Sequence, residues 1–393
     1  MKLCSKKWFF LLGFLVVLAV VAAACGGEEE EEAKAPFKLG VIESATGPGE
    51  TYGKVAINGK QLAVEEINAA GGVNGRKIEL IVEDGKCAAP SAITAYTKLT
   101  QVDGVKIILG TSCSGALLGI APLAERDKVI MFSGLATNPD IKFAGDYIYR
   151  TSLSDAFVGI DAGNRIYKDG VRKLATISES TDYAEGVRRE TANKFVELGG
   201  QIVAEERYAS DATDFRSIIT KVLAASPDAL MLSAQSEFTG GTLQKQLREL
   251  GYTGPVYAEV VSVGTTALDI AGEAATGTKG FTTLPDPTNT RMNEMLQRFR
   301  AKYGYTTLEW YIGSAYDDVY VAAECLKKTN DDQDVEGFRS CLDGITWSGT
   351  IGNFSFDEYG EVIGISNMLV EVLPVAERTT ENFGYKVIGP AAQ

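Results

Sequence analysis

A glycine-rich turn between an expected strand and an expected helix carries the hydroxyl groups best placed for ligand chemistry. It reads Gly110-Thr111-Ser112-Cys113-Ser114-Gly115. The phosphate-binding pattern of nucleotide-binding loops is missing, because Ala116 and Leu117 stand where that pattern needs Lys and Ser or Thr. Backbone N–H groups at a helix start, together with the hydroxyls of Ser112 and Ser114, would hold a small carboxylate instead.

A second hydroxyl-bearing turn follows the next expected strand and reads Leu135-Ala136-Thr137-Asn138-Pro139. The carboxyl ends of parallel strands meet at one edge of a sheet, and ligand sites of open α/β sheets form there. We therefore expect Ser114 and Thr137 to face the same site. The competing interpretation is that both hydroxyls only cap the helices that follow them.

Histidine is absent from the 393-residue sequence, which excludes His-dependent nucleophilic catalysis, His-ligated metals and an imidazole base. A serine or cysteine hydrolase centred on Ser112, Cys113 and Ser114 would lack its base, so we do not expect an enzyme. The net charge of −14, from 38 Lys and Arg against 52 Asp and Glu, opposes binding to a phosphate backbone. We expect neither a nucleic-acid partner nor a cofactor.

The first 36 residues read as an export and anchoring segment. Lysines, an uncharged apolar run and three alanines predict a signal peptide over residues 1–24. A permanent transmembrane helix is the alternative, but the apolar run is short for a bilayer span. Ala22-Ala23-Ala24-Cys25 looks like a bacterial lipobox, in which Cys25 is lipidated and becomes the first mature residue. Residues 25–36 would form an acidic tether, and the loss of three lysines would bring the net charge to −17.

Export changes how the six cysteines are interpreted. One is removed with the signal peptide and one is lipidated, which leaves four in an oxidising compartment. Four cysteines allow three pairings, and we favour Cys87 with Cys113 and Cys325 with Cys341, because each pair lies within one supersecondary unit. A metal site is the rival interpretation, but there is neither a CxxC pair nor a histidine, so we expect no metal.

Beyond residue 36, short β-branched runs alternate with longer segments of helical period, which predicts parallel sheets with crossover helices. The first set has expected strands at 37–42, 77–83, 106–109 and 129–132, and expected helices at 52–70, 91–101 and 115–126. The second has strands at 174–178, 201–206, 229–233 and 256–259, and helices at 183–198, 215–225 and 238–250. Helices at 290–303 and 313–328 and strands at 353–356 and 361–372 follow. We expect an α/β protein with two lobes of similar topology, to which the last segments return in turn.

Spaced motifs run in order along nearly all of the mature chain: Gly47-Pro48, Tyr52-Gly53, residues 67–75, Asp84 with Cys87, residues 110–114, Ala136-Thr137, residues 149–151, residues 182–186 and residues 270–273. In these motifs the chain resembles the leucine/isoleucine/valine-binding proteins, type I periplasmic solute-binding proteins of ABC importers. The resemblance implies two Rossmann-like doubly wound lobes, joined by a three-strand hinge, that close on a ligand like a trap. The expected lobes are 37–154 plus 286–362 and 155–285 plus 363–393.

The resemblance also implies a site for a zwitterion. Ser114, which follows Cys113, would give its N–H and hydroxyl to the ligand carboxylate. The segment Leu135-Ala136-Thr137 would receive the α-ammonium through a carbonyl and the Thr hydroxyl, and Glu259 would complete the ammonium site. A zwitterion needs donors on one side and an acceptor carboxylate on the other, and closure that removes water strengthens both.

Three aromatic positions of the family also have counterparts. Tyr183 matches the tyrosine of the second lobe, and Tyr52 and Tyr311 are similar to positions that line the side-chain pocket. Where the family often has a further tyrosine, this chain has Gln235, either a loop residue or a sign of a more polar pocket. Tyr311 could also simply pack a helix start.

The resemblance implies an exported, lipid-anchored and monomeric binding protein of a bacterium. It would capture a branched-chain or other hydrophobic amino acid and deliver it to an ABC permease in the membrane. Two alternatives keep the same fold. The protein would bind urea, short amides or an aromatic acid, or it would act as a sensor without transport.

Overall fold

The structure is a computed structural model that describes residues 34–304 and 308–391. The expected signal peptide and the expected lipidation site Cys25 lie outside these residues. Pro36–Gln393 forms one compact unit. Among the residues described, no helix combines the length and the apolar character that crossing a membrane requires.

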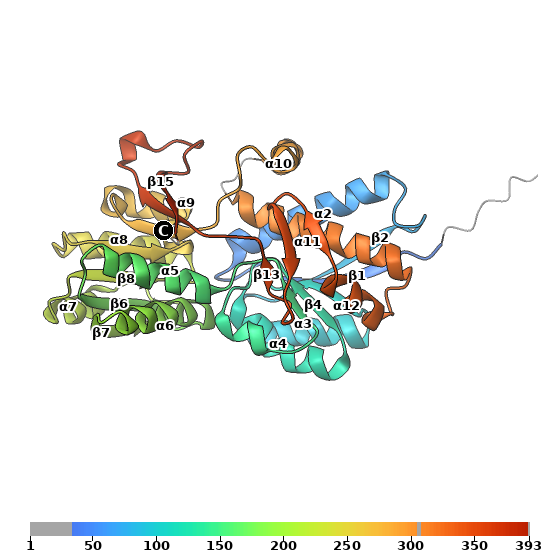
Figure 1. Cartoon of the computed structure of the whole chain (residues 1–393), viewed down its shortest axis with the longest axis horizontal. Helices are drawn as coiled ribbons and strands as arrows, with labels where there is room; N and C mark the ends of the chain where they lie inside the picture. Colours follow the sequence, from blue (N-terminus) through green and yellow to red (C-terminus); the bar gives the residue numbers. More distant parts are fainter. Residues whose placement is uncertain (1–33, 305–307, 392–393) are drawn as a thin grey trace, which may run out of the picture. The chain divides into compact units, whose positions relative to one another are not determined.

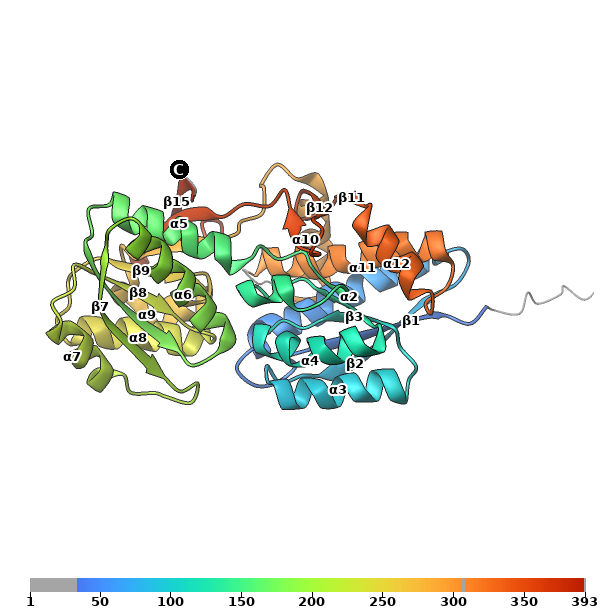
Figure 2. The ribbon, with the colours of Figure 1, turned by 60° about the horizontal axis from the view of Figure 1, so that its bottom comes forward.

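Five parallel strands form the first sheet, in the order β2-β1-β3-β4-β5 (Figure 1). Their side chains alternate between two apolar cores, as in parallel sheets covered on both faces. Leu39 and Val41 belong to the core that contains residues of α2 and α11, whereas Ile108 and Met131 pack with residues of α3 and α4. Figures 1 and 2 both show α2 and α11 on one side of these strands and α3 and α4 on the other. The elements are β1 (Phe37–Glu43), α2 (Glu50–Ala69), β2 (Ile78–Asp84), α3 (Ala89–Gln101), β3 (Ile107–Gly110), α4 (Ser114–Asp127), β4 (Ile130–Ser133) and β5 (Ile148–Arg150).

The second sheet has seven strands, in the order β15-β14-β10-β9-β8-β6-β7. The strands from β10 to β7 are parallel, and β14 and β15 add an antiparallel edge. Leu230 and Leu232 pack with residues of α7 and α8, and Met231 between them packs with residues of α5 and α6. The elements are α5 (Asp155–Lys168), β6 (Lys173–Glu179), α6 (Asp182–Glu197), β7 (Gln201–Tyr208), α7 (Arg216–Ala224), β8 (Ala229–Ser233), α8 (Glu237–Glu249), β9 (Val256–Glu259), α9 (Thr265–Ala271), β10 (Lys279–Thr282), β14 (Met368–Val372) and β15 (Tyr385–Pro390).

The segment after β10 returns to the first sheet, as expected. Helix α11 packs along α2, and Arg150 at the end of β5 pairs with Glu361 through a backbone bridge and a buried two-bond ion pair. A small antiparallel sheet of β11, β12 and β13 completes this part. The elements are α10 (Thr290–Tyr303), α11 (Glu309–Thr329), α12 (Val335–Asp343), β11 (Thr346–Ser348), β12 (Asn353–Phe356) and β13 (Val362–Ile363).

The chain passes between the two sheets three times, in segments 151–154, 283–289 and 364–367. The expectation of one continuous strand over 361–372 is therefore wrong: β13 ends at Ile363, the chain crosses, and β14 begins at Met368. An uninterrupted strand would have kept both ends in one sheet. The numerical limits of the two lobes stay a prediction.

Several elements were not anticipated, namely β5, α5, α9, β10, α12, β11 and β15. The first sheet, expected to be complete with four strands, has β5 as its fifth. Strands β5 and β10 have only three and four residues, too short for their pattern to stand out.

Two disulfides confirm the expected pairing, Cys87 with Cys113 and Cys325 with Cys341. The first joins the loop after β2 to the residue that precedes α4, so it fixes the turn that carries Ser114. The second joins α11 to α12 in the apolar core of the first sheet. On the chain-entropy model each bridge contributes roughly 3 kcal/mol to the free energy of unfolding.

Candidate functional site

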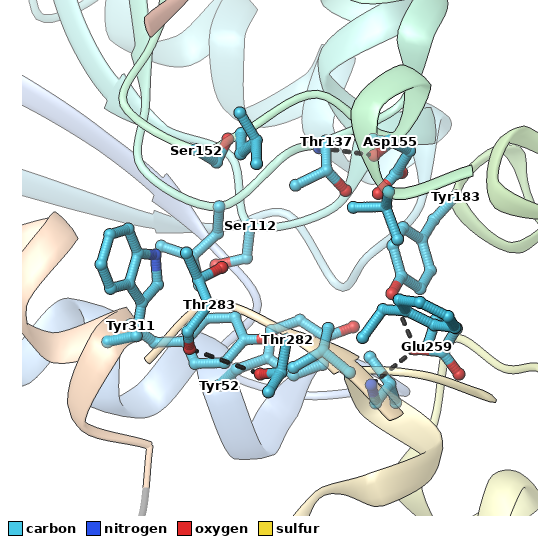
Figure 3. Close-up of a pocket in the computed structure, with 18 of the residues that line it drawn as sticks. Tyr52, Ser112, Thr137, Ser152, Asp155, Tyr183, Glu259, Thr282, Thr283 and Tyr311 are labelled. Atoms are coloured by element: carbon cyan, nitrogen blue, oxygen red, sulfur yellow. Dashed lines mark hydrogen bonds between the residues drawn. The ribbon is translucent and has the colours of Figure 1, made fainter. Parts of the chain in front are cut away.

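A pocket lies between the carboxyl ends of the strands of both sheets (Figure 3). This is where ligand sites of open α/β sheets are expected. Its volume is about 750 Å³, which includes the space open to solvent. Its lining comprises Tyr52, Ser112, Ser114, Gly134, Leu135, Thr137, Ser152, Leu153, Asp155, Val158, Tyr183, Gln235, Glu259, Val260, Val261, Phe281, Thr282, Thr283, Trp310, Tyr311 and Asn367.

One wall of the pocket is the N-terminus of α4. The turn into this helix requires glycine at Gly110, which has φ +132° and where a Cβ atom would stand 2.1 Å from the carbonyl oxygen of Ile42. The Ser114 hydroxyl oxygen accepts hydrogen bonds from the backbone N–H groups of Thr137 (3.2 Å) and Asn138 (3.1 Å). The Ser114 O–H is therefore free to donate to a ligand. Together with the first N–H groups of α4 it forms a set of donors that can bind a carboxylate.

Thr137 and Asp155 lie next to each other on another part of the lining (Figure 3). The backbone N–H of Asp155 donates to the Thr137 carbonyl at 2.8 Å. The side-chain oxygens of these two residues, in contrast to the backbone groups, are not paired. Oγ1 of Thr137 and Oδ2 of Asp155 are both buried, and neither has a hydrogen-bond partner among the described residues. Burial raises the pKa of Asp155 to about 8, although the nearby Thr137 hydroxyl and Arg150 guanidinium oppose the shift.

Glu259, at the end of β9, is fully buried and accepts five hydrogen bonds. Tyr183 donates its hydroxyl at 2.7 Å, and Ser262 donates both its hydroxyl (2.5 Å) and its N–H (3.0 Å). The N–H groups of Ala234 (3.1 Å) and Val261 (2.5 Å) complete the set. Burial nevertheless raises the pKa of Glu259, with these donors opposing it.

The remaining wall is apolar and aromatic. Tyr52 and Tyr311 are stacked with their ring centroids 6.1 Å apart, and Trp310 lies beside them in the lining. Tyr52, Trp310 and Tyr311 also border an adjoining open pocket, to which Phe383 and Tyr385 contribute. These rings offer contact area to an apolar side chain.

A direct contact between the two lobes joins two residues of the pocket lining. The Gln235 side-chain amide donates to the Tyr52 hydroxyl at 2.6 Å, and that hydroxyl donates to the backbone carbonyl of Gln235 at 3.2 Å. Tyr52 belongs to α2, whereas Gln235 follows β8 in the second sheet. The Gln235 amide therefore makes this contact, and whether it also makes the pocket more polar for a ligand stays a prediction.

Eight of the ten expected ligand residues line the pocket: Tyr52, Ser114, Leu135, Thr137, Tyr183, Gln235, Glu259 and Tyr311. Cys113 and Ala136 are not part of the lining, and their ligand contacts stay predictions. The Cys113 sulfur is bonded to Cys87 and lies 3.7 Å from the Tyr52 hydroxyl. The Ala136 carbonyl already accepts from Ser152 Oγ (2.7 Å) and Arg150 Nη1 (3.3 Å).

Sequence reasoning missed Ser152, Asp155 and Trp310. Asp155 is the first residue of α5 and follows Ser154, whose side chain caps the helix. In the sequence it therefore reads as an ordinary acidic residue at a helix start. The only available signal was its place just after the motif at residues 149–151.

The charged residues of the lining are Asp155 and Glu259, and no Lys or Arg of the described chain contributes to it. The N-terminus of α4 adds positive potential at the wall that carries Ser114. A ligand with a carboxylate and an ammonium group fits this distribution, because each charge meets its opposite.

The chain belongs to the periplasmic binding protein family, whose model matches residues 36–370. Members of this family are exported solute-binding proteins. The leucine-, isoleucine-, valine-, threonine- and alanine-binding protein of Pseudomonas aeruginosa is 29% identical over 356 residues, covering 87% of this chain and 91% of that protein. The match confirms the resemblance and the type I periplasmic binding protein fold.

Two solved structures share this fold at 25% identity and cover 90% of the chain. A leucine-binding protein of Thermotoga maritima has a TM-score of 0.79 and is covered over 98% of its length. A solute-binding protein of an ABC transporter from Rhodopseudomonas palustris, in complex with 3,4-dihydroxybenzoic acid, has a TM-score of 0.77 and is covered over 97%.

Proposed function

We propose that this protein captures a branched-chain or other hydrophobic amino acid between its two lobes and delivers it to the permease of an ABC importer. It acts as a monomer, anchored through a lipid on Cys25, and releases its ligand without catalysis. The observation that carries the proposal is the division of the pocket into three parts: a helix N-terminus with Ser114, a pair of buried carboxylates, and an aromatic wall.

Each part matches one group of such an amino acid. The α4 terminus and the Ser114 hydroxyl supply donors for the carboxylate, and the buried acids supply acceptors for the ammonium. A charge left unpaired in the closed pocket would cost several kcal/mol, so both ligand charges are recognised. The relative from Pseudomonas aeruginosa, named for aliphatic amino acids and threonine, supports the same ligand class.

An aromatic acid is the second candidate, because five aromatic residues line the pocket and a solved relative holds 3,4-dihydroxybenzoic acid. Such a ligand brings a negative charge without an ammonium group into a lining that already contains two carboxylates and no cation. Its affinity should therefore be low.

A thermal-shift screen separates these ligands. Leucine, isoleucine and valine should each raise the melting temperature, while 3,4-dihydroxybenzoate and urea leave it unchanged. A ligand at 100 times its dissociation constant stabilises the folded state by about 2.7 kcal/mol. The proposal would be refuted if the aromatic acid or urea raised the melting temperature and none of the twenty amino acids did.

A further inference from the structure

We propose that Ser112 is a specificity-determining residue, whose hydroxyl oxygen accepts a hydrogen bond from the side chain of the ligand. The pocket would then favour an amino acid with a hydroxyl group on its side chain over the hydrocarbon amino acid of the same shape. The inference rests on the proposed function and identifies, within it, the class of side chain that binds best.

A buried ion pair lies behind Ser112. Glu43 is the last residue of β1 and Lys60 belongs to α2, and both side chains are inaccessible to solvent. The Lys60 ammonium group donates to Oε1 of Glu43 at 2.6 Å. Oε2 of Glu43 accepts the hydroxyl proton of Ser112, which lines the pocket in the turn after β3. A buried ion pair often adds no stability over apolar residues of similar volume, so its place behind the pocket lining points to a role in binding.

The ion pair determines the direction in which the Ser112 hydroxyl group points. A carboxylate only accepts hydrogen bonds, so Ser112 is the donor and its proton is directed at Glu43. That proton is therefore not available to a ligand carboxylate. In the described part of the chain no residue donates to Oγ of Ser112, although the residue is only 6% exposed. The lone pairs of this oxygen remain for a donor on the ligand.

Two other hydroxyl groups of the lining also donate their protons to the protein. Ser152 donates to the Ala136 carbonyl at 2.7 Å, and Tyr52 donates to the backbone carbonyl of Gln235. With Ser112, these groups present oxygen lone pairs to the pocket instead of protons. A buried acceptor that meets only hydrocarbon costs free energy, so this lining pairs best with a ligand that donates.

Ser112 lies where the side chain of an amino acid would be. In Figure 3 it is on the same side of the pocket as Tyr52 and Tyr311, whereas Asp155 and Glu259 are on the opposite side. The charged groups of the ligand are matched elsewhere in the lining, so its side chain is the substituent left for this region. A neutral hydroxyl group supplies one donor there without adding a charge that would have to be desolvated beside the aromatic rings.

The test compares amino acids of the same shape that differ by a hydroxyl group in place of a methyl group. Threonine and valine form one pair, and homoserine and norvaline place the difference one bond further along the side chain. Calorimetry measures the four dissociation constants. In at least one pair the hydroxyl-bearing member should bind the wild-type protein about fivefold or more tightly than its partner. Ser112→Ala should abolish this preference, because the acceptor is lost.

A third ligand tests the direction of the Ser112 proton. O-methylserine has an ether oxygen in place of a CH₂ group of norvaline, so it accepts hydrogen bonds and donates none from its side chain. The wild-type protein should bind it no more tightly than norvaline. Glu43→Leu combined with Lys60→Met removes the ion pair without leaving one buried charge alone. In this double variant the Ser112 proton can donate to the ligand, so O-methylserine should gain about threefold relative to norvaline.

Ser217→Ala is the matched control, because it makes the same change at an exposed position of α7 outside the pocket lining and should leave all these ratios unchanged. Melting curves show whether each variant is folded, and the comparison on wild-type protein depends on no variant.

The inference is overturned if neither hydroxyl-bearing member reaches the expected preference, or if folded Ser112→Ala protein keeps the wild-type preference. An unchanged ratio of O-methylserine to norvaline in the folded double variant would overturn the role of the ion pair. Wild-type protein that binds no amino acid at all would refute the proposed function instead, so the two failures are distinguishable.

Discussion

Asp155 shows at the scale of one residue how a binding site can cost stability. The groups that act on it electrostatically are Arg150, Glu259, Glu190, Tyr183 and Tyr311. Burial outweighs them and raises its pKa from 3.8 to about 8. Between these pH values the folded protein keeps a proton that the unfolded chain releases. The free energy of unfolding therefore decreases as the pH rises through this window.

Asp155→Asn should therefore stabilise the ligand-free protein at high pH. We expect the melting temperature at pH 9 to rise by about 2 °C or more over wild type, with a smaller gain at pH 5, where the wild-type carboxyl is mostly protonated. Melting curves of both proteins at the two pH values check this. Equal gains at pH 5 and pH 9, or a loss at pH 9, would contradict it.

At the scale of elements, α2 and the turn after β8 meet through Tyr52 and Gln235. The two hydrogen bonds between them join residues of different lobes beside the pocket, and both residues line it. A contact that forms when the pocket closes stabilises the closed state and so slows the escape of the ligand. The same ring stacks on Tyr311, so its apolar contacts do not depend on the hydroxyl.

Tyr52→Phe should therefore increase the dissociation rate of the ligand with little change in the association rate. Removal of this hydroxyl leaves the Gln235 amide without its partner, and we expect about a three- to tenfold faster dissociation. Stopped-flow fluorescence with leucine would measure both rates. Tyr96→Phe is a control, because its hydroxyl contacts Asp127 away from the pocket. A dissociation rate equal to that of wild type would show that the contact does not hold the lobes closed.

At the scale of the whole molecule, two sheets with similar strand orders share one pocket, and three chain segments connect them. Such connections allow the lobes to move as bodies around a few residues. The acidic segment before residue 37 would keep this folded body close to the membrane if Cys25 carries a lipid. A tethered binding protein stays near its permease, which raises its effective concentration there.

Cys25→Ser should move the protein from the membrane fraction to the soluble extracytoplasmic fraction. Fractionation and immunoblotting of the expressing bacterium measure the distribution. The ligand affinity of the purified variant should equal that of wild type, because Cys25 is not among the residues that line the pocket. Retention in the membrane fraction would indicate an uncleaved apolar helix as the anchor.

Much of the architecture could be predicted from the sequence because its causes are local. Helical period, β-branched runs and paired glycines placed most helices and strands of both sheets, and the short sequence separations of 26 and 16 favoured the observed disulfides. The turns at Ser114 and Thr137 could be assigned to one site, because parallel strands bring their carboxyl ends to the same edge.

The tertiary structure alone decided how the charges of the site are used. Residue type alone does not tell whether Glu259 or Asp155 has its hydrogen bonds satisfied. In the structure Glu259 meets five donors, including Tyr183 76 positions away, whereas Oδ2 of Asp155 has no hydrogen-bond partner among the described residues. Tyr52 and Gln235, 183 positions apart, meet only because the chain crosses between the sheets. Local preferences determine elements, but whether a buried carboxylate is satisfied depends on which distant donors packing brings within about 3 Å of it.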